Sequence, residues 1–137
     1  MSEDSSKLFS VYKKDGIIYC ICPSHTIVDL ETLKEGLKRR IELAEGKPHP
    51  ILIDARDVKY WTLESRKFGL SKEAHQFVSA YVVLLNSAII RTIVNWALKV
   101  FPITIPRRVF TNEEDAIRWL RQFVDKAEKP NKPLLVF

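Results

Sequence analysis

The chain has 137 residues, a length that suits one domain burying about two thirds of its unfolded surface. Hydrophobic residues make up 46% of it and charged residues 28%, with 4 glycines, which excludes a disordered or fibrous protein. The formal net charge of +5 would attract a polyanion, but the basic residues are spread along the chain. The densest run, LKRR at residues 37–40, has acids around it, so we expect a solvated helix face there and no nucleic-acid site.

The cysteines and the first residues indicate the compartment. Cys20 and Cys22 lie two apart in an expected strand and do not face one another across strands, so we expect free thiols. The start, MSEDSSKLF, has acids where a signal peptide would be basic, and no apolar run approaches ~18 residues. We therefore expect a soluble cytoplasmic protein without a membrane span.

A β-hairpin is the first element that we expect. Two runs rich in β-branched and aromatic residues, about 8–13 and 17–22, flank Asp15 and Gly16. Asp-Gly between such runs is a strong hairpin signal, because glycine tolerates the positive φ of a tight turn. Two antiparallel strands should therefore open the fold.

A helix and a buried strand follow the hairpin. Apolar residues recur at spacings of three and four over residues 30–44, with Asp29 as the N-cap and Gly46 then Pro48 at the end. The segment PILIDA, residues 50–55, is apolar at successive positions, which is typical of a strand covered on both faces.

The middle of the chain predicts two helices around a strand. Thr62 is the expected N-cap of a helix that reaches about Phe77, and residues 80–85 form a continuous apolar strand. Asn86 and Ser87 then begin a third helix, AIIRTIVNWALKVF.

The last part predicts a strand, a helix and a tail. Pro106 places the first half of the strand at 103–110 near a sheet edge or outside the ladder. Thr111 and Glu114 form a T-x-x-E capping box for a helix that extends to about Ala127. The sequence KPNKP then precedes an apolar end, LLVF, which could add a strand to a sheet edge.

The resulting order, ββαβαβαβα, predicts an α/β fold with a largely parallel sheet and one antiparallel partner from the hairpin. We expect a single domain over residues 1–137, with a core of about 8–127 and a C-terminal tail at 128–137.

This order, with ILIDARDV as the third strand and its exit, resembles the SpoIIAA-like fold that STAS domains share with their relatives. The closing half strengthens the resemblance with S-x-x-x-R and an asparagine in the third helix, then P-x-R-x-F, an acidic helix start and A-x-x-W-L. The matching residues are Ser87, Arg91, Asn95, Pro106, Arg108, Phe110, Glu113, Glu114, Ala116, Trp119 and Leu120. The chain is similar to small stand-alone SpoIIAA-like proteins of bacteria, which implies a mixed sheet of about five strands, an N-terminal hairpin and about four helices.

The resemblance also bears on a phosphorylation switch. In STAS-type anti-sigma factor antagonists, the loop after the third strand carries D-S-[ST]-G, whose central hydroxyl is phosphorylated. Thr62, Leu63, Glu64 and Ser65 align with these four positions, so that Leu63, without a hydroxyl, stands at the phosphoacceptor position. Glu64 either imitates a permanent negative charge or only stabilises the helix start.

One candidate ligand or partner surface surrounds the exit of the third strand. Asp54 stands at the carboxyl end of that strand, where open α/β sheets bind ligands, and it either joins a binding surface or fixes the loop by accepting backbone N–H groups. Arg56 and Asp57 pair with each other or with neighbours. The residues that we assign to this surface are Asp54, Asp57, Thr62, Glu64 and Ser65.

A second candidate surface is the third helix, with Arg91, Asn95 and Trp96. Arg91, Asn95 and Lys99 form one narrow polar stripe, and the remaining positions are mostly apolar, more than one sheet should cover. Three covers stay open: the neighbouring helix or the LLVF tail, a second copy or another protein, and a small apolar ligand.

No motif predicts catalysis or a cofactor. The three histidines, His25, His49 and His75, fall in separate segments without an H-E-x-x-H pattern, and no glycine-rich phosphate loop is present. A zinc site from Cys20, Cys22 and one histidine would have the wrong spacing. We therefore expect no catalytic residue, no metal and no cofactor.

The functional expectation is a non-enzymatic regulatory or protein-interaction module, homodimeric, without the usual phosphoacceptor hydroxyl. The alternative is a carrier or sensor of a small apolar, lipid-like ligand. A weaker third hypothesis is an enzyme that uses Asp54 with Thr62 or Ser65.

Overall fold

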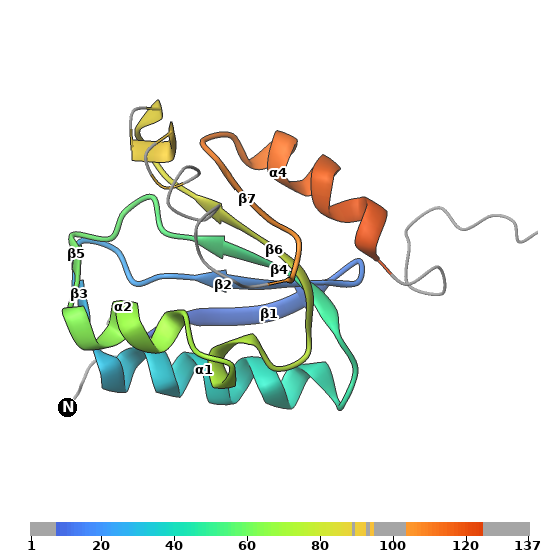
Figure 1. Ribbon diagram of the computed structural model, residues 1–137, viewed down its shortest axis with the longest axis horizontal. Coiled ribbons are helices and arrows are strands. Elements are labelled where there is room, and N and C mark those ends of the chain that lie inside the picture. Colours follow the sequence, from blue (N-terminus) through green and yellow to red (C-terminus); the bar gives the residue numbers. More distant parts are fainter. Residues whose placement is uncertain (1–7, 89, 93, 95–103, 125–137) are drawn as a thin grey trace, which may run out of the picture.

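The computed structural model describes residues 8–88, 90–92, 94 and 104–124. Its centre is a five-stranded sheet in the order β1-β2-β4-β6-β7, beside a two-stranded sheet of β3 and β5. The strands are β1 (Ser10–Lys14), β2 (Ile17–Ile21), β3 (Ile27–Val28), β4 (His49–Asp54), β5 (Tyr60–Trp61), β6 (Val78–Leu84) and β7 (Arg107–Phe110). The helices are α1 (Leu30–Ala44), α2 (Leu63–Gly69) and α4 (Glu113–Leu120), with the short 3₁₀ helices η2 (Glu73–His75) and η3 (Arg121–Phe123). In Figure 1, α1 and α2 lie on one side of the sheet and α4 on the other.

The predicted hairpin and parallel sheet are confirmed. β1 pairs antiparallel with β2, and Asp15 and Gly16 both have positive φ, 52° and 82°, as a two-residue hairpin turn of type I′ requires. The β2–β4, β4–β6 and β6–β7 pairs are all parallel. The mixed α/β architecture predicted from the order of elements is therefore the observed one.

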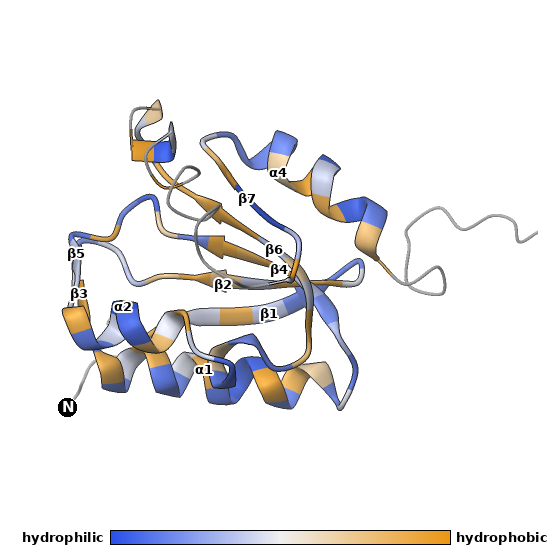
Figure 2. Ribbon diagram, in the orientation of Figure 1, coloured by the Kyte–Doolittle hydropathy of each residue, from blue (hydrophilic) through white to orange (hydrophobic). Residues whose placement is uncertain are grey.

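Two hydrophobic cores lie on opposite faces of the sheet. Successive residues of a strand contribute their side chains to different cores. Ile51 belongs with Ile18, Phe9 and Ala44 to one core, whereas the next residue, Leu52, packs with Leu120 of α4 in the other. The central strands are mostly hydrophobic and the helices carry mixed segments (Figure 2). This pattern explains the continuous apolar runs, because each central strand is covered on both faces.

Helix α1 begins as predicted but buries a residue that we expected in solvent. The Asp29 Oδ1 atom accepts a hydrogen bond from the Thr32 backbone N–H at 2.9 Å, which confirms the N-cap. The fully buried positions of this helix are Gly36, Arg40 and Ala44, four residues apart. The prediction of a solvated face for residues 37–40 is therefore wrong for Arg40, whose place in this stripe turns it toward the sheet.

The second helix is shorter than predicted. Thr62 is its N-cap, since its Oγ1 accepts from the Ser65 N–H at 3.2 Å, but α2 ends at Gly69 instead of near Phe77. Ser71 replaces the next turn: its hydroxyl donates to the Phe68 carbonyl at 2.6 Å and accepts from the Ala74 N–H at 3.2 Å. These local bonds offer the backbone an alternative to the helix, and η2 follows.

The last helix begins one residue later than the predicted capping box. Its N-cap is Asn112, whose Oδ1 accepts from the Asp115 N–H at 3.0 Å, so the assignment of this role to Thr111 is wrong. Asparagine is at least as good a cap as threonine, which explains the shift. α4 gives way to η3 after Leu120, and Ala127 lies outside the described residues.

The edge strand β7 explains the P-x-R-x-F and A-x-x-W-L motifs. β7 begins at Arg107, later than the predicted start at residue 103, so Pro106 precedes the strand. The carbonyl of Pro106 still accepts from the Tyr81 N–H at 3.0 Å. The Arg108 guanidinium lies 5.1 Å from the ring centroid of Phe110 and 5.9 Å from that of Trp119. These cation–π contacts join β7 to α4, so this part of the family pattern serves packing.

Only the start of the predicted third helix is described. Ser87 begins it, since its Oγ accepts from the Ile90 N–H at 3.2 Å and its carbonyl accepts from the Arg91 N–H at 2.9 Å. Asn95, Trp96 and the tail at 128–137 lie outside the described residues. Within the described part of the chain, no helix has the length and hydrophobicity needed to cross a lipid bilayer.

Candidate functional site

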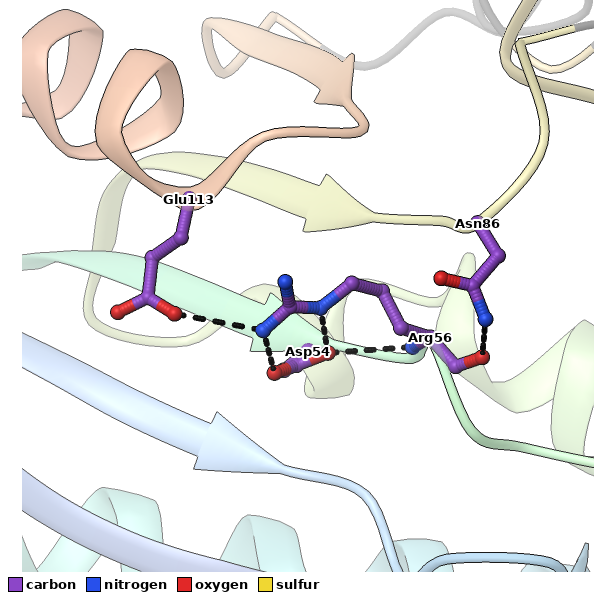
Figure 3. A network of polar contacts seen from close by, with 4 residues as sticks. All are labelled: Asp54, Arg56, Asn86 and Glu113. Carbon is purple, nitrogen blue, oxygen red and sulfur yellow. Dashed lines mark hydrogen bonds and ion pairs between the residues drawn. The ribbon is translucent and has the colours of Figure 1, made fainter.

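A charged network lies at the carboxyl end of β4. The Arg56 guanidinium binds Asp54 through two contacts, Nε to Oδ1 at 3.0 Å and Nη2 to Oδ2 at 2.7 Å. The same Nη2 reaches Glu113 Oε1 at 3.3 Å, and Asn86 donates to the Arg56 carbonyl (Figure 3). The network therefore joins the exits of β4 and β6 to the start of α4.

The electrostatics of Asp54 follow from these contacts. Burial by itself raises the pKa of this carboxyl, but the hydrogen bonds and the positive charge of Arg56 outweigh burial, so the pKa lies below its usual value. Asp54 also accepts a hydrogen bond from the Arg56 backbone N–H at 3.1 Å, which is the geometry expected of a carboxylate that fixes the loop. Because both carboxylate oxygens are held by Arg56, a ligand would have to displace it to reach them.

The other residues of this predicted surface do not join Asp54. Thr62 and Ser65 form the start of α2, where the buried Ser65 hydroxyl donates to the Thr62 carbonyl at 2.9 Å. Asp57, Glu64 and Leu63 are exposed. Of the two alternatives for Arg56, the structure shows pairing with its neighbours, Asp54 and Glu113, and not with Asp57. The role of the predicted surface, Asp54, Asp57, Thr62, Glu64 and Ser65, in binding a ligand or partner stays a prediction.

A cavity lies elsewhere, between the sheet and the α1–α2 layer. Its volume is about 420 Å³, and its floor is formed by side chains of β2, β4 and β6, among them Cys20, Ile53 and Val83. Helices α1 and α2 supply Leu37 and Phe68 to its opposite wall. Of the residues assigned from sequence, Ser65 lines this cavity and Asp54 and Thr62 do not.

Burial makes the cysteine in this wall an apolar group. The pKa of Cys20 is raised to about 11, mainly by burial and against the opposing charges of Arg40 and Arg39. The thiol is therefore protonated at neutral pH, and Cys20 and Cys22 are both free, as predicted.

Several polar side chains interrupt the apolar lining, and three of them, Arg40, His75 and Tyr81, have partners that show how they are held. Arg40 donates from Nη1 to the Gln76 carbonyl at 2.9 Å and from Nη2 to the Ala74 carbonyl at 3.0 Å. His75 Nδ1 lies 2.8 Å from the Ser71 carbonyl and therefore carries a proton, because a carbonyl can only accept. Its Nε2 lies 3.4 Å from the Tyr81 hydroxyl. Arg40, His75 and Tyr81 all line the cavity.

Sequence reasoning missed this cavity and its polar groups. The spacing of Gly36, Arg40 and Ala44, four apart, is a signal for burial of Arg40, but the basic run LKRR favours a solvated face at the same position. His75 and Tyr81 come from different elements, and their approach depends on the turn after α2, which replaces the expected longer helix.

Metal ligation has no support in the geometry of the described residues. Among residues 8–88, 90–92, 94 and 104–124, no group of three or more histidine, cysteine, aspartate or glutamate side chains is arranged to hold a metal ion.

Comparison with known proteins identifies the fold and the family. An uncharacterised protein of the DUF3478 family from Shewanella loihica PV-4, with a SpoIIAA-like fold, superposes with a TM-score of 0.55 at 15% sequence identity. The match covers 82% of this chain and 91% of that chain, so the SpoIIAA-like fold predicted from sequence is confirmed. A search of curated proteins gave no match. The family model of a domain of unknown function, DUF7793, matches residues 11–124, and the chain therefore belongs to the DUF7793 family.

Proposed function

We propose that this protein binds a small, largely apolar ligand in the cavity between the sheet and the α1–α2 layer, as a carrier or sensor. The observation that supports this function is the cavity itself, about 420 Å³ in volume. Ligand sites typically have volumes of roughly 300–1,000 Å³, apolar walls and a few polar groups that orient the ligand. The cavity has each of these properties.

The proposal is for binding without chemistry. An enzyme that used Asp54 with Thr62 or Ser65 would need these groups around a common polar pocket. Asp54 is held by Arg56, and the Ser65 hydroxyl donates to the backbone of Thr62. The hydroxyl and the carboxylate therefore have separate partners, and we assign both to local structure.

Native mass spectrometry and calorimetry test this function. Freshly purified protein should carry a small apolar molecule, and after its removal the protein should bind decanol, a neutral probe with a flexible chain. The variant Val83→Phe places a larger side chain in the cavity wall and should weaken decanol binding by about tenfold or more, since even one added methylene disturbs a packed site.

The matched control is Ile117→Phe, which adds similar bulk on α4, whose core lies on the other face of the sheet. It should leave decanol binding unchanged. Binding that is absent in the wild type, or unaffected by Val83→Phe, would contradict the proposed site.

A protein-interaction role is a second candidate, supported by a separate feature. Three large hydrophobic side chains, Ile27, Tyr60 and Leu63, are exposed by 54%, 53% and 52%. Ile27 and Tyr60 are register partners in the β3–β5 pair, and Leu63 follows as the first residue of α2. We call these three residues the β3–β5 patch. Exposed apolar clusters are common at protein interfaces, so the patch supports a homodimer or another protein partner.

A further inference from the structure

We infer that the ligand of the cavity carries an organic acid group and that Arg40 recognises it. This inference rests on the proposed function and names the class of ligand: an apolar body with one anionic head. The observations that support it are the burial of Arg40, the partners of its guanidinium and the charges of the cavity wall.

Among the residues that the structure describes, Arg40 is a buried cation without a counter-charge. It is 5% exposed, on the face of α1 that packs toward the sheet. Its two hydrogen bonds run to the backbone carbonyls of Ala74 and Gln76, which are neutral. No acid in the described part of the chain forms an ion pair with it.

The neighbouring arginine on the same helix shows a different arrangement. Arg39 is at the surface, where its Nε and Nη2 atoms contact both oxygens of Glu35 at 2.7–3.1 Å and Nη2 also donates to the Phe9 carbonyl. Arg39 thus has a carboxylate partner, whereas the more deeply buried Arg40 has none in the described part of the chain. An anion bound in the cavity would supply the missing negative partner of Arg40.

Energetics favour such an anion. Burial of a charged group is unfavourable unless it is paired and hydrogen-bonded. A guanidinium has five N–H donors and stays charged at neutral pH, and two carbonyls engage Nη1 and Nη2 of Arg40. A carboxylate would gain charge-assisted hydrogen bonds that an alcohol cannot form.

The charged side chains of the cavity wall also favour an anion. The lining side chains that the structure describes include Arg40 and Arg66 and no aspartate or glutamate. His75 and Tyr81 add further polar groups in the wall. A purely structural role for Arg40 accounts for the attachment of η2 to α1, but the two carbonyls are neutral and leave the positive charge unpaired among the described residues.

Titration calorimetry on the wild type tests the inference without any mutation. Decanoate should bind at least roughly tenfold more tightly than decanol, because hydrogen bonds to charged groups are stronger than neutral ones. The affinities for 2-naphthoate and 2-naphthol give the same comparison of acid and alcohol for a flat aromatic body. The two pairs together show whether the cavity prefers a flexible, lipid-like acid or an aromatic acid. A preference for the acid in either pair supports the inference.

Two variants assign the preference to Arg40. Arg40→Met removes the charge and should abolish the difference between acid and alcohol, while Arg40→Lys keeps the charge and should retain part of it. Arg39→Met, on the same helix but outside the cavity wall, should behave like the wild type. A loss of acid preference in Arg39→Met equal to that in Arg40→Met would overturn the assignment.

The outcomes separate this inference from the function on which it rests. If decanol and decanoate bind equally in the wild type, and naphthol and naphthoate do too, the cavity binds apolar molecules but Arg40 does not select acids. If none of the four probes binds, the proposed function itself fails. If Arg40→Met does not fold, the wild-type comparison still decides whether the cavity selects acids.

Discussion

At the scale of single residues, the contacts of Asp54 place its charge in a structural network. Arg56 holds both carboxylate oxygens and also contacts Glu113 at the start of α4. The side chain of Asp54 is 14% exposed and that of Arg56 is 32% exposed, so the pair is only partly screened by solvent. Such a pair contributes more than an exposed ion pair and less than a fully buried one.

The first prediction concerns Arg56→Gln. This variant leaves Asp54 partly buried without its cation, so the pKa of Asp54 should rise and the free energy of unfolding should fall by about 1 kcal/mol at neutral pH. A carboxyl whose folded pKa is lowered stabilises the fold above its unfolded pKa of about 3.9 and loses this contribution as the pH falls through the folded value. The stability advantage of the wild type should therefore shrink below about pH 4.

Urea denaturation from neutral to acidic pH measures this difference. The control is Arg118→Gln, because the Arg118–Asp115 pair is 75% and 54% exposed and should contribute little. Equal losses in the two variants, or an advantage that does not change in acid, would argue against the assigned role of the Asp54–Arg56 pair.

At the scale of elements, two helical glycines have opposite surroundings. A Cβ atom on Gly36 of α1 would lie 3.0 Å from the ring of Phe9, whereas a Cβ on Gly69 of α2 would meet nothing within 4 Å. Close approach of α1 to Phe9 thus explains a glycine in the middle of a helix. The glycine at the end of α2 has no such packing reason.

The second prediction compares alanine at these two positions. Gly69→Ala should raise the free energy of unfolding by about 0.5 kcal/mol, because alanine has the higher helix propensity. Gly36→Ala should lower it by about 1 kcal/mol, because overpacking against Phe9 outweighs the same propensity gain. Chemical denaturation of both variants provides the measurement, and a gain in Gly36→Ala as large as that in Gly69→Ala would refute the packing argument.

The elements predicted correctly are those whose signals are local. Asp15-Gly16 predicted the hairpin because the positive φ of the turn is a property of those two residues. Asp29 and Thr62 predicted helix starts because a cap is closed within three residues. The end of α2 was missed because Ser71 ends the helix through side-chain bonds that periodicity does not reveal.

The cavity was beyond local reasoning for another reason. Its wall combines residues from β2, β4, β6, α1, α2 and η2, so its existence depends on how far apart the layers pack. Arg40 illustrates the limit: its spacing from Gly36 and Ala44 places it on the buried face, yet only the structure shows which partners it meets there. The Asp54 carboxylate was located correctly at the end of β4, but the sequence left open which neighbour Arg56 would pair with.

At the scale of the whole molecule, the two faces of the sheet differ. The face beneath α4 is a closed core, in which Leu84, Ala116 and Leu120 are fully buried. The face toward α1 and α2 contains the cavity, and the exposed β3–β5 patch lies where β3, β5 and α2 meet. The proposed ligand site and the proposed partner surface would thus share α2, because Phe68 lines the cavity and Leu63, the first residue of the same helix, belongs to the β3–β5 patch. This shared helix makes a sensor role physically reasonable, since a ligand in the cavity would contact the helix that a partner binds.

The last prediction is the homodimer. If the β3–β5 patch is its interface, the wild type should behave as a dimer in light scattering at micromolar concentration, and Leu63→Lys should convert it to a monomer by placing a charge in an apolar contact. Ile90→Lys is the matched variant, since Ile90 is similarly exposed, at 51%, and stands near the start of the expected third helix. Dissociation by Ile90→Lys alone would move the interface to that helix. A wild type that remains strictly monomeric would remove the dimer, and the β3–β5 patch would then have to serve a different protein.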